Sequence, residues 1–403
     1  MRSNTREYMM KLNPKRVWVP GPLIVGAGPS GLATAACLKE KGVPSLILEK
    51  EDCIASSWKL RTYERLRLHL PKQYCELPHM PFPPGFPTYP TKQQFINYLE
   101  AYAQCFSIEP LFGMEVKCAE YDHSIGFWRV QANDLEFICR WLVVATGENS
   151  VPVVPDIIGF ADFHGRVLHS SSYKKGDDFE GEKVLVVGCG NSGMEVCLDL
   201  CNNHAHAYMV VRGKLHILAR EIFGISTFGL SMWMMKWFPM NFVYSLLLFF
   251  SWMILGGTEK HGLVRPKVGP LQLKMTSGKP LVLGIGTFAR IQSSHIKVVP
   301  GINKFVENGV EFVNGKHEEF DSIILATGYK SNVPSWLKES EFFSEQDGQP
   351  KAPFPNSWRG KNGLYATGFT KRGLLGASID AQRIAEDVAR QWNFKTWHFS
   401  LEF

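Results

Sequence analysis

The sequence contains a short apolar run, a glycine-rich turn and a helical segment in direct succession. Apolar residues 22–25 predict a buried strand, and the turn GAGPSG at 26–31 follows it. A helix is predicted over 32–41, and a second apolar strand over 45–48. Glu49 comes directly after this second strand, where a carboxylate can accept hydrogen bonds from a ribose.

The same succession returns in the second half of the chain with one change. A strand is predicted over 183–187, the turn GCGNSG occupies 188–193, and a further strand covers 208–211. Arg212 then stands where the first unit has an acid. A cation at this point suits an adenosine 2′-phosphate, so the second nucleotide is expected to be NADP rather than NAD.

Both turns have the spacing G-x-G-x-x-G, and they are called the first fingerprint (26–31) and the second fingerprint (188–193) below. Each glycine of this spacing has a physical role. The first makes a tight turn, the second lets the backbone approach a pyrophosphate, and the third lets the helix pack closely. Two ordinary glycine turns are the alternative, but strand, spacing and terminal residue all occur twice. The residues expected to line the two pyrophosphates are Gly26, Ala27, Gly28, Pro29, Ser30 and Gly31, then Gly188, Cys189, Gly190, Asn191, Ser192 and Gly193.

Each unit also closes in the same way, with an apolar strand leading into Ala-Thr-Gly. These strands are predicted at 141–144 and 322–325. The expected fold class is α/β, with two Rossmann-like dinucleotide-binding domains, of which the second, the NADPH domain, is inserted in the first. The predicted domains are 1–166 (first dinucleotide-binding domain, first part), 167–330 (NADPH, with a helical insert at about 225–256) and 331–403 (return segment of the first domain).

Composition fits a globular protein of two to three domains. The chain has 403 residues, with 45% hydrophobic and 20% charged residues. The net charge of +6 is scattered, so nucleic-acid binding is not expected. Nine cysteines without a C-x-x-C pair indicate free thiols in a reducing compartment. No metal-ligand cluster is apparent, and the N-terminal segment lacks the apolar core of a signal peptide.

Residues 233–255 are rich in aromatic and aliphatic side chains. Lys236 and Pro239 interrupt the stretch, which leaves fewer than the ~20 residues that a membrane-spanning helix needs. A buried helical insert near the substrate site is the first interpretation, and a patch that touches a membrane surface is the second.

The segment before the second fingerprint reads F-x-G-x-x-x-H-x-x-x-Y, with Phe163, Gly165, His169 and Tyr173. This pattern resembles the signature of class B flavin-dependent monooxygenases. Longer strings resemble the YUCCA group of plant flavin-containing monooxygenases: YERLRLHLPKQYCELP (63–78), FPTYPTKQQFINYL (86–99), ATGENS (145–150), ATGYKSNVPSWLK (326–338) and GFTKRGLLGAS (368–378). The resemblance extends over nearly the whole chain.

The resemblance implies a reaction. FAD in the first domain is reduced by NADPH from the second and takes up O2 to give a flavin C4a-(hydro)peroxide. In the YUCCA group this species converts indole-3-pyruvate to indole-3-acetate (auxin) and CO2 by oxidative decarboxylation. The protein then supplies position, a dry pocket and hydrogen-bond donors, and needs no metal. The expected compartment is the cytoplasm or the cytosolic face of the endoplasmic reticulum.

The resemblance also suggests individual roles. Trp58, Arg65 and Leu66 fall in the segment that family members place along the flavin. His69 is a departure, because many flavin-containing monooxygenases have asparagine in this segment; a hydrogen-bonding catalytic role and simple packing stay open for it. For His169 and Tyr173 a structural link is expected, and Arg220 is a second candidate for the 2′-phosphate.

Three other functions share parts of this pattern. An S- or N-oxygenating monooxygenase of small nucleophiles has the same fingerprints, and the longer strings argue against it. A flavin disulfide reductase needs a redox-active cysteine pair beside the flavin, which the sequence lacks. A flavin-binding sensor without turnover does not need the complete NADP fingerprint.

Overall fold

The computed structural model describes residues 15–266, 281–339 and 341–399. It divides into two units, each built on a parallel sheet with helices packed against it. The first unit comprises the chain up to residue 60, 72–151 and the chain from 329 onward; the second comprises 61–71 and 152–328. The chain thus leaves the first unit twice and returns to it twice. The domain borders given above concern cofactor binding and remain a prediction.

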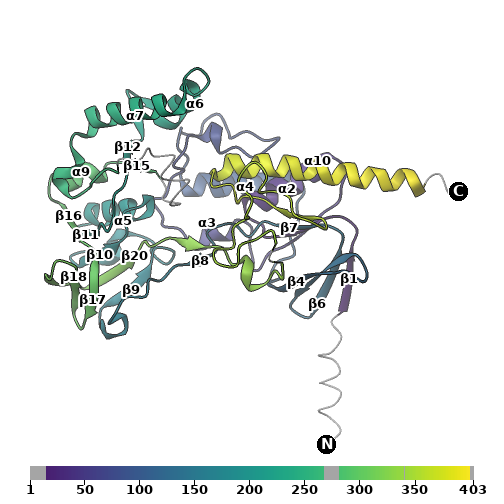
Figure 1. The fold of residues 1–403 in the computed structure, drawn as a ribbon, viewed down its shortest axis with the longest axis horizontal. Helices are drawn as coiled ribbons and strands as arrows, with labels where there is room; N and C mark the ends of the chain where they lie inside the picture. Colours follow the sequence, from purple (N-terminus) through teal and green to yellow (C-terminus); the bar gives the residue numbers. More distant parts are fainter. Residues whose placement is uncertain (1–14, 267–280, 340, 400–403) are drawn as a thin grey trace, which may run out of the picture. The chain divides into compact units, whose positions relative to one another are not determined.

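The parallel sheet of the first unit has the strand order β22-β7-β2-β3. Its strands are β2 (Leu23–Val25), β3 (Leu46–Leu48), β7 (Leu142–Val144) and β22 (Leu364–Ala366). They are uninterrupted apolar runs because both faces of such a sheet are covered. The helices are α2 (Pro29–Glu40), α3 (Ser56–Leu60), α4 (Lys92–Cys105) and α10 (Gly373–Phe399). Helix α10 packs along α2, as Figure 1 shows.

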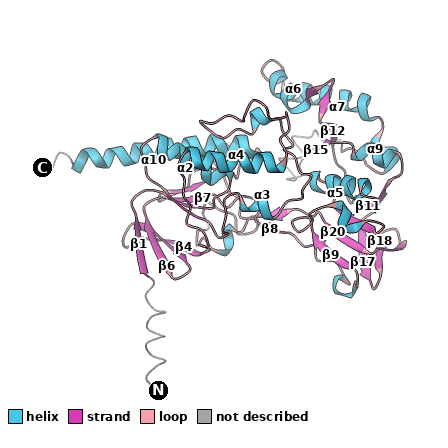
Figure 2. Ribbon diagram, turned by 180° about the vertical axis from the view of Figure 1, so that it is seen from behind, coloured by secondary structure: helices cyan, strands magenta, loops and turns pink. Residues whose placement is uncertain are grey.

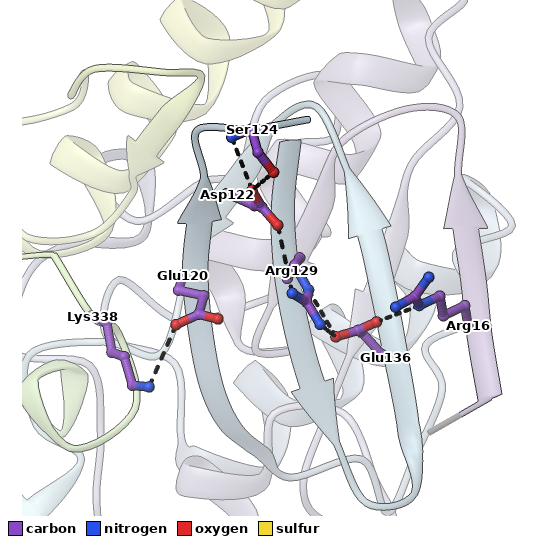
Figure 3. Close-up of polar contacts among 7 residues, drawn as sticks. All are labelled: Arg16, Glu120, Asp122, Ser124, Arg129, Glu136 and Lys338. Carbon is purple, nitrogen blue, oxygen red and sulfur yellow. Dashed lines mark hydrogen bonds and ion pairs between the residues drawn. The ribbon is translucent and has the colours of Figure 1, made fainter. Parts of the chain in front are cut away.

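A second sheet in this unit has the order β1-β6-β5-β4, formed by β1 (Lys15–Val19), β4 (Val116–Asp122), β5 (Phe127–Ala132) and β6 (Leu135–Cys139). The carboxylate of Glu136, which is almost fully buried, ties three of its strands together (Figure 3). It lies 2.9 Å from Arg16 Nε and 2.6 Å from Arg129 Nη2. Arg129 also faces Asp122 at 3.5 Å. These paired charges fix the strand register, since a shift by one residue would leave Glu136 buried without a cation.

The parallel sheet of the second unit has the order β16-β11-β10-β20-β9. Its strands are β9 (Arg166–His169), β10 (Lys183–Val187), β11 (His206–Val210), β16 (Ile296–Val299) and β20 (Ser322–Leu325). Helices α5 (Asn191–Asn202) and α9 (Thr287–Gln292) pack on it. An antiparallel sheet is formed by β17 (Ile302–Val306), β18 (Gly309–Phe312) and β19 (His317–Glu319).

The predicted insert is helical. It contains α6 (Thr227–Met234) and α7 (Met240–Leu255), with Pro239 as the N-cap of the second helix. Figure 2 shows both helices at one end of their unit. The remaining short elements are β8 (Val151–Pro152), β12 (Ile217–Ala219), β13 (Glu221–Ile222), β14 (Ile225–Ser226), β15 (Val282–Gly284) and β21 (Tyr329–Lys330), with 3₁₀ turns at Lys72–Tyr74, Phe160–Asp162, Gly176–Phe179, Thr258–His261 and Val333–Ser335.

Candidate dinucleotide-binding sites

The first fingerprint forms the turn between β2 and α2. Gly26 has φ +110°, and a Cβ atom there would lie 2.7 Å from the Ala145 carbonyl oxygen. A Cβ on Gly31 would lie 2.0 Å from the Gly26 carbonyl oxygen. Both positions therefore require glycine because the backbone packs against itself. Gly28 is different, since a Cβ there would meet no described atom within 4 Å.

The N-terminus of α2 is left without a side-chain cap. Its N-cap is Gly28, and its first turn holds no acid. Helix α4, in contrast, begins with a complete capping box formed by Thr91 and Gln94. Backbone N–H groups at an uncapped helix start suit an anion, and the open side of Gly28 gives it room.

The side chain of Glu49 forms hydrogen bonds that support the first fingerprint loop. Its Oε2 accepts a hydrogen bond from the Ala27 N–H at 2.8 Å. Its Oε1 accepts from the Ser56 hydroxyl and from the Glu51 N–H, each at 3.1 Å. The side chain is 5% exposed. The structure therefore places the predicted ribose-binding acid directly against the fingerprint, where it also holds the turn in shape.

A second acid at this site was not expected from the sequence. Asp380 on α10 is 1% exposed, and its Oδ1 has no hydrogen-bond partner among the described residues. Its Oδ2 accepts from the Gly368 N–H at 3.4 Å, and Gly368 in turn packs on Ser30 of the fingerprint. Burial raises the pKa of the Asp380 carboxyl group to about 7. An unpaired buried carboxyl group of this kind fits the hydroxyl of a bound ligand.

The second fingerprint repeats the geometry of the first. Gly188 has φ +123°, and a Cβ there would lie 2.4 Å from the Ala326 carbonyl oxygen. A Cβ on Gly193 would lie 2.1 Å from the Gly188 carbonyl oxygen, whereas Gly190 faces open space. Gly190 is also the N-cap of α5, which has no side-chain cap and no acid in its first turn. Two separate loops therefore offer the same cradle to a pyrophosphate.

Arg212 lies just beyond the end of β11. Its side chain is exposed and makes no hydrogen bond or ion pair with any other residue that the structure describes. Its stem passes near Gly301, where a Cβ would be 3.7 Å from Arg212 Cγ. A guanidinium held at the end of the second strand and left unpaired suits a phosphate ligand. Arg220 lies elsewhere, within electrostatic range of His69 and Glu195.

The segment 61–71 packs against α5 within the second unit. The Glu64 N–H donates to the Lys174 carbonyl oxygen at 2.9 Å. Arg65 Nη1 lies 3.7 Å from Asp199 Oδ1, and His69 Nδ1 lies 3.5 Å from Glu195 Oε1.

The two residues of this segment that the resemblance places along the flavin, Arg65 and Leu66, have different surroundings. Leu66 is buried, while Arg65 faces an acid of α5. Trp58, on α3 in the first unit, makes an edge contact with Phe95 of α4 at 4.5 Å between ring centroids.

The contact between His69 and Glu195 is not an ion pair at neutral pH. Burial and the Arg220 cation lower the pKa of His69 to about 4, although 33% of its side chain is exposed. Burial raises the pKa of Glu195 to about 7, against the opposing effect of Arg65 and Arg220. The imidazole is therefore neutral and offers one donor and one acceptor.

The motif F-x-G-x-x-x-H-x-x-x-Y, which precedes the second fingerprint, makes structural contacts through His169 and Tyr173. The Tyr173 hydroxyl donates to Asp199 Oδ2 at 2.7 Å. His169 Nε2 lies 3.1 Å from the Gly328 carbonyl oxygen, which belongs to the second Ala-Thr-Gly turn. The motif thereby joins β9, α5 and the end of β20 within the second unit, and the expected link between the domains stays a prediction.

The described residues contain no group of three or more His, Cys, Asp or Glu side chains that could hold a metal ion. The same residues contain no helix long and apolar enough to cross a membrane.

Comparison with known proteins agrees with this geometry. A family model described as pyridine nucleotide-disulphide oxidoreductase matches residues 23–220. Indole-3-pyruvate monooxygenase YUCCA6 of Arabidopsis thaliana is 59% identical over 387 residues, which cover 94% of this chain and 93% of the relative. Indole-3-pyruvate monooxygenase YUCCA1 of Oryza sativa subsp. japonica is 54% identical over 379 residues, covering 94% and 93%.

Solved structures support the fold. An oxidized steroid monooxygenase bound to NADP has a TM-score of 0.74 at 17% identity and covers 94% of this chain and 86% of its own. A flavin-containing monooxygenase from Stenotrophomonas maltophilia has a TM-score of 0.70 at 20% identity, covering 94% and 99%. The expected α/β architecture with two dinucleotide-binding domains is confirmed.

Proposed function

This chain belongs to the family of YUCCA indole-3-pyruvate monooxygenases, and we propose that it converts indole-3-pyruvate to indole-3-acetate in auxin synthesis. The reaction consumes NADPH, a proton and O2, and yields the acid, CO2, water and NADP+. One oxygen atom enters the new carboxyl group and the other leaves as water. Bound FAD supplies the electron transfer and the activation of O2, so the side chains need only bind, orient and exclude water.

The observation that supports this proposal is that the chain contains two fingerprint loops of the same geometry. Both fingerprints have a first and a third glycine that backbone contacts require, and both have a middle glycine that faces open space. Both also lead into an uncapped helix. A protein that holds one dinucleotide does not need this arrangement twice.

We assign FAD to the first unit. Backbone N–H groups of residues 26–31 bind its pyrophosphate, and Glu49 binds its adenosine ribose. Asp380 accepts a hydrogen bond from one of its hydroxyl groups, which satisfies the otherwise unpaired Oδ1. Trp58 of the first unit is assigned to the flavin side of the site, and for Arg65 and Leu66, which belong to the second unit, a role beside the flavin stays a prediction.

We assign NADPH to the second unit. Residues 188–193 bind its pyrophosphate at the start of α5, and Arg212 binds the 2′-phosphate. His69, as a neutral imidazole, provides a hydrogen-bonding group near the substrate rather than an acid or base. Its lowered pKa supports the neutral form throughout the physiological pH range.

The test is to incubate the purified flavoprotein with NADPH, O2 and indole-3-pyruvate and to identify the products by mass spectrometry. Indole-3-acetate and CO2 in equal amounts, with one NADPH consumed for each, are expected. Thioethers and tertiary amines, offered in parallel, are expected to stay unchanged. Oxygenation of these compounds without decarboxylation would favour the S- or N-oxygenating alternative.

We further propose that α6 and α7 touch a membrane surface while the enzyme resides in the cytoplasm. Large apolar side chains are exposed along both helices and in the turn between them, among them Trp233, Trp237, Phe242, Phe249 and Trp252. Residues 222–258 contain one charged side chain, Lys236. Tryptophan-rich faces with a flanking cation are typical of interfacial helices.

Sedimentation with anionic phospholipid vesicles tests this contact. The wild-type protein is expected to co-sediment, and the pair of substitutions Trp237→Ser and Trp252→Ser to remain in solution. Trp18→Ser removes an equally exposed tryptophan from the first unit and serves as the matched control. Equal sedimentation of all three proteins would exclude the insert as the membrane contact.

A further inference from the structure

Glu195 is a buried acid whose position the fingerprint alone does not explain. It lies on α5, two residues after the last glycine of the turn, and is 5% exposed. Tyr63 lies beside both Glu195 and Ser192, and Glu195 raises while Ser192 lowers the pKa of its hydroxyl group. Because Ser192 belongs to the fingerprint, this hydroxyl joins the acid to the loop that surrounds the pyrophosphate.

The charged and titratable groups around Glu195 come from three segments. Arg65 and His69 face it from 61–71, and Arg220 from the end of β12. Asp199 follows one turn later on α5 itself. Asp199 is already engaged, since Tyr173 donates to it at 2.7 Å and Asn203 at 3.3 Å. Glu195 is thus the acid of this cluster that lies nearer to the fingerprint.

A bound dinucleotide changes the electrostatics at this end of α5. The helix begins after Gly190, so Glu195 lies about 7 Å along the axis from the N-cap. Phosphates at the helix start bring negative charge towards a carboxyl group in a poorly solvated interior, where repulsion is weakly screened.

We propose that Glu195 is a positioning residue for the dinucleotide of the second fingerprint: it holds the Tyr63 hydroxyl on Ser192, and its carboxyl group takes up a proton when the dinucleotide binds. This inference rests on the proposed assignment of NADPH to the second unit.

The neighbouring groups do not compete for this proton near pH 7. The pKa of His69 is lowered to about 4, and that of Tyr63 is raised well above its usual range. Glu195, with its pKa of about 7, is close to half protonated before binding. An increase of one unit on binding corresponds to an uptake of about 0.4 proton at pH 7.

Isothermal titration calorimetry of the FAD-loaded protein at pH 7, in buffers with different heats of ionisation, measures this uptake. NAD+ is titrated beside NADP+ because it lacks the 2′-phosphate, whose own protonation contributes near this pH. The wild type is expected to take up about 0.4 proton more than Glu195→Gln. Between pH 6 and pH 9, the Kd for NAD+ is expected to rise by up to about tenfold more in the wild type.

A matched variant tests whether Glu195 is the group that takes up the proton. Glu182→Gln changes an acid of the same unit that accepts from Ser322 instead, and it is expected to retain the wild-type uptake. Equal uptake by wild type and Glu195→Gln would overturn the proposal, as would binding of NAD+ to the wild type without any proton uptake. Failure of the wild type to bind either dinucleotide would instead overturn the proposed function.

Discussion

At the scale of single residues, the middle glycine of each fingerprint differs from the other two. The first and third glycines are needed for backbone packing, whereas the missing side chain of the middle glycine leaves room for a ligand. Gly28 has an ordinary extended backbone with φ −79°, and no described atom lies near its missing Cβ. Alanine therefore fits the folded chain at this position. Its methyl group, however, occupies the space through which a pyrophosphate reaches the backbone.

We therefore expect Gly28→Ala to fold normally and to purify without flavin. Absorbance at 450 nm measures the bound FAD, and the thermal unfolding of the flavin-free protein should match that of flavin-stripped wild type. Gly85→Ala is the control, because Gly85 is also open but lies outside the fingerprint. Full flavin occupancy in Gly28→Ala would refute the assignment of the first cradle.

We expect Arg212 to determine the choice between the two nicotinamide cofactors. A charged hydrogen bond to phosphate contributes on the order of 1.5–3 kcal/mol. Arg212→Ala is therefore expected to weaken NADPH binding by roughly one to two decades and to leave NADH binding almost unchanged. Lys214→Ala, in the same exposed loop, is the control. Equal weakening of both cofactors would show that the 2′-phosphate is bound elsewhere.

At the scale of elements, the sequence predicts those parts whose pattern is local. The apolar runs at 22–25, 183–187 and 322–325 are observed as β2, β10 and β20 within one residue at each end. The helical insert at 225–256 is observed as α6 and α7. The final helix, α10, extends over Gly373–Phe399.

Other features depend on tertiary contacts and have no local signal. The segment 61–71 packs on α5 of the second unit, although it lies between elements of the first. Glu195 and Asp380 look like ordinary helical acids in the sequence. Their importance follows from burial next to a fingerprint, and only the path of the chain brings them there.

Helix α10 carries Asp380 into the interior, and this gives a pH dependence with a definite sign. The pKa is raised from 3.8 to about 7 by burial. Between these values the folded state holds a proton that the unfolded state has released. The stability of the flavin-free protein should therefore fall as pH rises from about 4 to about 7, by at most about 4 kcal/mol.

Asp380→Asn is expected to remove this part of the pH dependence, which thermal unfolding of the flavin-free protein between pH 4.5 and pH 8 measures. The variant should be more stable than the wild type at pH 8, where the wild-type carboxyl group is charged and its Oδ1 has no hydrogen-bond partner among the described residues. Asp134→Asn replaces an exposed acid and should follow the wild-type curve. An unchanged profile in Asp380→Asn would mean that this carboxyl group is solvated.

At the scale of the whole molecule, one chain provides two dinucleotide sites. Neither a side-chain nucleophile nor a metal cluster is needed to explain the reaction. The solved structures that resemble it share its fold at low sequence identity. Two similar relatives, from Arabidopsis thaliana and Oryza sativa, are indole-3-pyruvate monooxygenases, and the reaction proposed above decarboxylates this 2-oxo acid. The fate of the oxygen atoms distinguishes this reaction from hydrolysis or from oxidation by free hydrogen peroxide.

If the enzyme delivers oxygen directly from O2 to the former keto carbon, that carbon carries one new oxygen atom in the product. Under ¹⁸O2 in ordinary water, indole-3-acetate is therefore expected to contain one labelled atom, which its mass measures. The keto oxygen exchanges with water, so the second carboxyl oxygen stays unlabelled. Catalase added to the mixture should leave both the yield and the label unchanged. Unlabelled acid would show that the new oxygen atom comes from water, and a yield that catalase abolishes would show that free hydrogen peroxide breaks the carbon–carbon bond in solution.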